Sequence, residues 1–193
     1  FKKNKQNIVL GNLFSSASQS FDKAVISQTW GLNRLINVIP GTLIKKNLLK
    51  KTGNFKVLRA GYDRIWILNV RQKFKVLDNK ENILKYRDKS DSNNLIKLFN
   101  KIYLYSYHSS EVFKKKKFIY LVVFLIFMFS SVYIHLMNSI LVYTILRLLF
   151  PFLKSKKIYD LCDLRTLLFL IPVGFIIDFA RILAFFKKLV KSI

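Results

Sequence analysis

Cysteine, proline, glycine and acidic residues are all scarce in this chain of 193 residues. It has one Cys, three Pro and six Gly, and 10 Asp and Glu stand against 34 Lys and Arg. The single cysteine, Cys162, excludes a disulfide framework within the chain and any metal site built from several cysteines. A formal net charge of +24 would suggest a nucleic-acid partner. We expect no nucleic-acid partner, however, because the aromatic residues cluster in the apolar runs and not among the lysines.

Long apolar runs indicate a membrane protein. Hydrophobic residues make up 52% of the chain, and no formally charged residue occurs from Phe118 to Leu146. That run exceeds the roughly 20 residues of a spanning helix. Within residues 111–153 we expect a transmembrane helical hairpin, with spans from about Phe118 to Leu136 and Ser139 to Leu153. A single tilted helix is the alternative. Lysines at both ends of the hairpin predict a multi-pass membrane protein whose N-terminal domain is cytoplasmic.

A third hydrophobic segment fills residues 154–193. A full crossing would carry its terminal lysines to the other side of the membrane, against the positive-inside rule. Pro172 and Gly174 suggest instead a break that makes a re-entrant or interfacial helix pair. Asp178 and Arg181 are three residues apart on one helical face, and we expect them to pair with each other.

The first 110 residues alternate between helical and extended patterns. A helix or helix-like crossover is expected in SFDKAVISQTWGLNRLI, a turn at Pro40 and Gly41, and a short helix in KKNLLKK that stops at Gly53. An apolar helix follows from Asp63, and FKVLD and NILKYRD predict two short β segments or one irregular strand pair. The stretch NNLIKLFNKIYLYSYHSS predicts an amphipathic helix.

The order of these signals resembles the second half of an inverting glycosyltransferase of family 2. The turn PGTLIKK, the stop KTGNF, the acidic turn RAGYD, the apolar helix and the strand FKVL follow one another as in that family. The resemblance covers about residues 5 to 110. It implies an α/β fold class: a partial GT-A half-domain on the acceptor side over residues 1–110, followed by a C-terminal α-helical membrane region.

Asp63 stands where the family has its catalytic base. Inverting sugar transfer needs a base that removes the acceptor hydroxyl proton during attack on the anomeric carbon. A structural alternative is a helix cap or a partner of Arg59 or Arg64. The other candidate substrate-binding residues are Gly41, Thr42, Arg59, Tyr62 and Trp66. Gly41 and Thr42 fit a plain turn equally well, and Trp66 fits either a sugar-stacking platform or a core position.

Two departures from the family pattern bear on activity. Tyr62 stands where the family usually has Glu, and the chain has no Asp-x-Asp pair to hold the divalent metal, Mg or Mn, on a nucleotide-sugar donor. Because the chain begins with Phe1, we expect those ligands upstream and an inactive fragment here. The predicted function is a membrane-anchored transfer of sugar from a nucleotide-sugar donor to a glycan or lipid-linked acceptor. The alternative is a non-catalytic integral membrane subunit of an organellar or bacterial complex.

Overall fold

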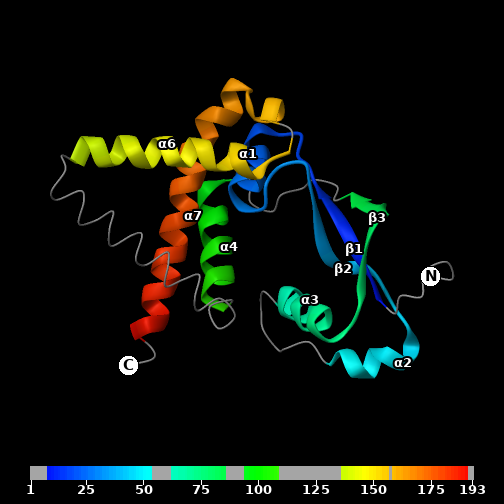
Figure 1. Cartoon of the computed structure of the whole chain (residues 1–193). Helices are drawn as coiled ribbons and strands as arrows, with labels where there is room; N and C mark the ends of the chain where they lie inside the picture. Colours follow the sequence, from blue (N-terminus) through cyan, green and yellow to red (C-terminus); the bar gives the residue numbers. More distant parts are fainter. Residues whose placement is uncertain (1–7, 54–61, 86–93, 109–135, 157, 191–193) are drawn as a thin grey trace.

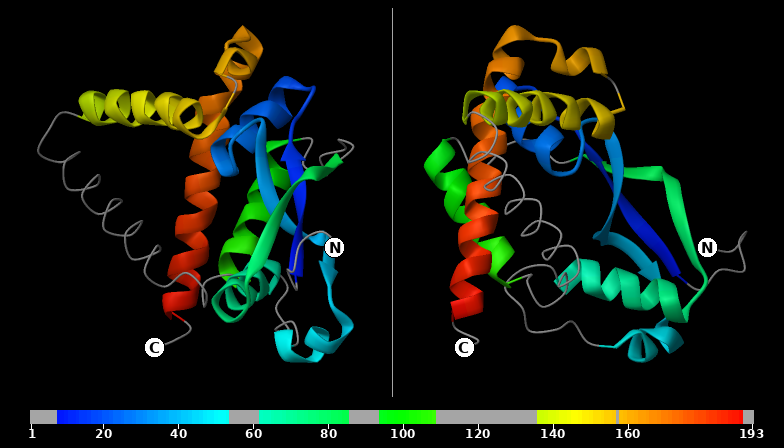
Figure 2. Two further views of the ribbon diagram at one scale, coloured as in Figure 1. Left: turned by 45° about the vertical axis from the view of Figure 1, so that its right-hand side comes forward. Right: turned by 60° about the vertical axis from the view of Figure 1, so that its left-hand side comes forward.

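The described residues form a mixed α/β structure. A computed structural model describes residues 8–53, 62–85, 94–108, 136–156 and 158–190 (Figure 1). They contain a three-stranded sheet and six α-helices, which confirms the expected α/β class. The sheet with α3 lies on one side of the molecule, and α4, α6 and α7 lie on the other (Figures 1 and 2).

The sheet has the strand order β2-β1-β3. Strand β1 (Ile8–Ser15) pairs antiparallel with β2 (Arg34–Ile44) and parallel with β3 (Val76–Lys85). The expected pair of short β segments is thus one longer strand, and its partner is β1. A parallel neighbour requires a crossover connection, and here the chain between β1 and β3 includes β2 and α3.

Pro40 and Gly41 lie within β2, so the expected chain reversal at this point is wrong. Residues 39 to 42 of β2 lie opposite the single residue Leu10 and form an irregular bulge. The Thr42 hydroxyl accepts a hydrogen bond from the Gly11 N–H at 3.1 Å and donates one to the Val38 carbonyl at 3.0 Å. A Cβ on Gly11 would lie 1.9 Å from the Pro40 carbonyl oxygen, so this close approach requires glycine.

Two short helical turns connect the sheet to α3. Helix α2 (Lys46–Leu49) and the 3-10 turn η1 (Lys50–Thr52) coincide with the predicted KKNLLKK helix. Gly53 ends them with a φ of 79°, as expected of a glycine stop.

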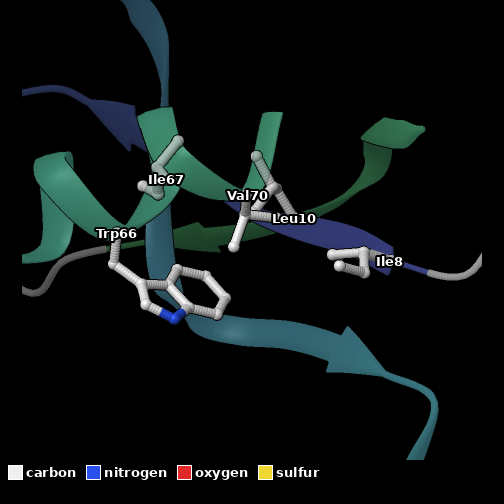
Figure 3. Packing of buried hydrophobic residues seen from close by; sticks show 5 residues of the cluster. All are labelled: Ile8, Leu10, Trp66, Ile67 and Val70. Carbon is white, nitrogen blue, oxygen red and sulfur yellow. The ribbon is translucent and has the colours of Figure 1, made fainter. Parts of the chain in front are cut away.

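Helix α3 (Tyr62–Lys73) covers one face of the sheet and closes the first hydrophobic core. Its buried apolar residues, Trp66, Ile67 and Val70, face the strands. Figure 3 shows this core, which consists of Ile8, Leu10, Trp66, Ile67 and Val70. Full burial of one such side chain contributes about 1.5–3 kcal/mol. The N-terminal turn of α3 is thereby fixed relative to the sheet.

The second core joins helices from distant parts of the sequence. Helix α1 (Ser20–Thr29) and helix α4 (Leu95–His108) both pack on α7 (Leu164–Val190). The buried residues of this second core are Ala24, Leu98, Leu170, Val173 and Ile177. Helix α4 begins where the Asn94 side-chain oxygen accepts a hydrogen bond from the Lys97 N–H at 2.8 Å.

Helix α6 (Leu136–Lys154) runs across α7, whereas α4 lies alongside it (Figures 1 and 2). The 3-10 turn η3 (Ile158–Leu161) connects α6 to α7. Two of the described helices are long and apolar enough to cross a membrane: Met137–Lys154 and Leu164–Lys188. The other expected span, from about Phe118, lies outside the described residues apart from its last residue.

Helix α7 is continuous from Leu164 to Val190, so the expected break at Pro172 and Gly174 is wrong. Pro172 removes one backbone donor, but residues on both sides of it, Leu170 and Val173, are buried in the second core. Packing therefore holds the two halves in one helix. Gly174 is buried at the contact of α7 with Arg147 and Gln28, and a Cβ there would lie 3.0 Å from each side chain.

Candidate active site

Asp63 lies in the first turn of α3 with its side chain exposed. Its Oδ1 accepts a hydrogen bond from the Arg64 backbone N–H at 2.9 Å. A carboxylate at this end of a helix is stabilised by the unpaired N–H groups and the helix dipole. This contact matches the capping alternative, and the exposed carboxylate also remains accessible to a ligand.

The other predicted site residues that the structure describes differ in their surroundings. Trp66 is 5% exposed and packs in the sheet core, in agreement with the core alternative for this residue. Thr42 is engaged in closing the β2 bulge, and beside it Gly41 has a φ of 76°. Tyr62 is exposed at the start of α3. Arg59 lies outside the described residues.

The sheet carries a polar cluster that the sequence analysis did not predict. Arg71 of α3 forms an ion pair with Asp78 of β3 at 2.6 Å and donates a hydrogen bond to Asn37 of β2 at 3.0 Å. Asn37 in turn donates to Asp78 and to the buried Asn12 of β1. Asn and Asp are uncommon in strands. Their presence in three strand segments is the sequence signal that could have indicated this polar cluster. This network ties α3 to all three strands.

A second polar cluster joins the helices of the second core. Arg147 of α6 forms an ion pair with Asp178 of α7, and the Tyr143 hydroxyl donates to the same carboxylate oxygen at 3.0 Å. We expected Arg181 as the partner of Asp178, and the structure provides Arg147 from another helix. Arg147 also donates to Gln28 of α1 at 3.2 Å. The Gln28 amide donates at 3.0 Å to the carbonyls of Arg147 and Leu170, so three helices share one network.

Asp163 connects the starts of α1 and α7. Its Oδ2 accepts hydrogen bonds from the Ser20 hydroxyl at 2.8 Å and the Thr166 hydroxyl at 3.1 Å. The Ser20 hydrogen bond, with further bonds from Thr166 and from the Arg165 backbone, holds the pKa of Asp163 below its ordinary value of 3.8. The carboxylate thereby acts as a cap for α7 that is itself fixed by α1.

Two apolar hollows lie beside α4, away from Asp63. One has a volume of about 270 Å³ and is lined by Leu95, Ile96, Phe99, Ile176 and Phe179. The other, of about 510 Å³, is lined by Phe21, Asn94, Leu95, Ile96 and Phe169. Their linings suit hydrocarbon and offer almost no groups for a sugar or a nucleotide.

Within the described ranges, no three His, Cys, Asp or Glu side chains come together in a way that could hold a metal ion. The structure therefore offers no residues there for the divalent ion expected with a nucleotide-sugar donor. Comparison of the chain with protein-family models, with curated proteins and with solved structures finds no match in any of the three.

Proposed function

We propose that this chain is the acceptor-side part of a membrane-anchored inverting glycosyltransferase. The observation that supports this best is the position of Asp63: an exposed carboxylate in the first turn of a helix that Trp66, Ile67 and Val70 anchor in the sheet core. A general base must be accessible to substrate and held in place by a rigid support. The order of the sequence motifs around it, from PGTLIKK to FKVL, indicates the reaction class, inverting glycosyl transfer.

In the proposed reaction, Asp63 accepts the proton of an acceptor hydroxyl. The hydroxyl oxygen then bonds to the anomeric carbon of the donor sugar as the bond to the nucleotide diphosphate breaks on the opposite face. The leaving diphosphate takes the bonding electron pair.

The test separates a base from a helix cap. Asn caps helices as well as Asp does but cannot accept the proton, so Asp63→Asn in the complete gene product should keep stability and donor binding. Turnover of a nucleotide sugar should fall by about 100-fold or more. Asn69→Ala, at an exposed position on the same helix, is the control and should leave turnover unchanged. Wild-type turnover in Asp63→Asn would show that the base assignment is wrong.

A non-catalytic membrane subunit is the second candidate. The contact that favours it is the hydrogen bond from the Arg64 N–H to Asp63, which gives this acid an ordinary structural role. In that case the complete gene product would turn over no nucleotide sugar, and it would co-purify in a fixed ratio with other membrane proteins after mild detergent extraction.

A further inference from the structure

Helix α7 carries an exposed apolar stripe along its whole length. The stripe consists of residues spaced four and seven apart, which places them on one face of the helix. They are 40% to 70% exposed: Leu164, Leu168, Phe175, Phe179, Phe186 and Val190. Of the charged residues inside the helix, Asp178 is turned inward to Arg147. A face of this kind must be covered by apolar material.

The length of α7 alone would allow it to cross a bilayer. Its 27 residues span about 40 Å at 1.5 Å per residue, more than the hydrocarbon core of about 30 Å. The packing of its other face points to a different placement. There α7 forms the second core with α1 and α4, so any movement of α7 into the membrane would carry those helices with it.

Helix α4 is the reason why crossing is unfavourable. It lies alongside α7, and Lys97, Asn100 and Lys101 are exposed on its outer surface. In a crossing orientation these three polar side chains would face hydrocarbon, where ammonium groups are costly. In addition, α6 runs across α7, so the two helices cannot both lie along the membrane normal (Figures 1 and 2).

The flank of α4 next to α7 has the composition of a membrane interface. Phe99, Tyr103 and Tyr107 stack in sequence, with ring centroids 6.0 and 6.5 Å apart. Phe99 also contacts Phe179 of the stripe, and the Lys187 ammonium lies 5.8 Å from the centre of the Tyr103 ring. Tyr rings with nearby lysines are typical of the headgroup level, where the lysines attract anionic lipids.

We propose that α7 lies along the membrane surface in one leaflet and does not cross the bilayer. Its apolar stripe rests in the acyl chains, and the exposed lysines of α4 remain in water or among the headgroups. The occupant of the stripe is a bilayer with anionic headgroups, which complements the charge of +24. This inference does not depend on the proposed transferase activity.

The single cysteine makes the topology directly measurable. Cys162 is exposed just before α7, and Lys187 is exposed near its other end, outside the stripe. Three proteins are compared: the wild type, C162S with Lys187→Cys, and C162S with Lys101→Cys. Each is treated with a membrane-impermeant maleimide in right-side-out and in inverted vesicles of the expressing cell's membrane. Labelling after detergent solubilisation gives the total of accessible thiols.

All three thiols should react in the same vesicle orientation and stay unlabelled in the other. Reaction of Cys162 and Lys187→Cys in opposite orientations would establish that α7 crosses the bilayer and overturn the proposal. So would protection of either thiol in both orientations, because that end would then lie within hydrocarbon.

A depth measurement tests the direction of the stripe. A fluorophore is attached at Phe175→Cys or, as the matched control, at Lys101→Cys, each in the C162S protein. Phospholipids with brominated acyl chains should quench the fluorophore at position 175 more strongly than the one at position 101. Equal quenching, or stronger quenching at 101, would show that the stripe does not face the lipid.

Discussion

The ion pair between Arg147 and Asp178 allows a quantitative prediction about the helical core. The two side chains are 11% and 19% exposed, so neither charge is well solvated. Asp178→Asn keeps the size of the side chain but leaves the Arg147 charge without its counter-ion. Removal of one partner of a buried pair costs 3–5 kcal/mol, and the residual exposure favours a value of about 3 kcal/mol.

Removal of both charges should lower the stability of the helical core less. The double variant Arg147→Met with Asp178→Leu replaces the pair by apolar side chains, a change that is often close to neutral. Gln28 would lose the hydrogen bond donated by Arg147, and the Tyr143 hydroxyl would lose its acceptor, each at about 1 kcal/mol. The double variant should therefore be more stable than Asp178→Asn by about 1 kcal/mol.

The assay is denaturant unfolding in detergent micelles, followed by circular dichroism, for the wild type, Asp178→Asn and the double variant. Tyr143→Phe removes the hydrogen bond to Asp178 but keeps the aromatic ring, and it serves as the control, with an expected loss of about 1 kcal/mol. The reasoning is refuted if Asp178→Asn unfolds at the wild-type midpoint, or if the double variant is as unstable as the single one.

Two further predictions concern the sheet and the start of α7. Gly11→Ala would place a Cβ 1.9 Å from the Pro40 carbonyl oxygen, so the β2 bulge must open; we expect a loss of about 3 kcal/mol or more in the same unfolding assay. The lowered pKa of Asp163 means that its stabilising contribution is fully present above pH 3.8 and is lost as the pH falls through the folded-state value. Ser20→Ala removes the main cause of that shift, so an acid titration followed by circular dichroism should show a smaller loss of stability than in the wild type; an unchanged acid response would contradict this assignment.

Local signals in the sequence predicted the elements that depend on neighbouring residues. The apolar spacing after Asp63 and after Asn94 gave α3 and α4, and Gly53 marked a stop whose positive φ the structure contains. Each of these features depends on residues within a few positions of one another, which is the range over which periodicity and capping act.

The features that sequence reasoning missed depend on distant residues. The Pro40–Gly41 segment stays in a strand because Gly11, about thirty residues earlier, leaves room for it and bonds to Thr42. Pro172 does not break α7 because α1 and α4 hold both halves. Asp178 forms an ion pair with Arg147 on another helix, which no local pattern reveals. The proposed role of Asp63 depends on the motif order together with its exposed position on an anchored helix, since the hydrogen bond that its carboxylate accepts also fits a helix cap.

The bonds from α1 to α7 have a consequence for the order of events during synthesis. The Ser20 hydroxyl donates a hydrogen bond to Asp163, 143 positions later, and the Gln28 amide donates one to the Leu170 carbonyl, 142 positions later. At a ribosomal rate of about 5–20 residues per second, α1 waits roughly 7 to 30 seconds for its partner helix to be made. During that interval its apolar face, including Phe21 and Val25, has no permanent cover. Nascent chains of this protein are therefore expected to require a chaperone or early contact with a lipid surface.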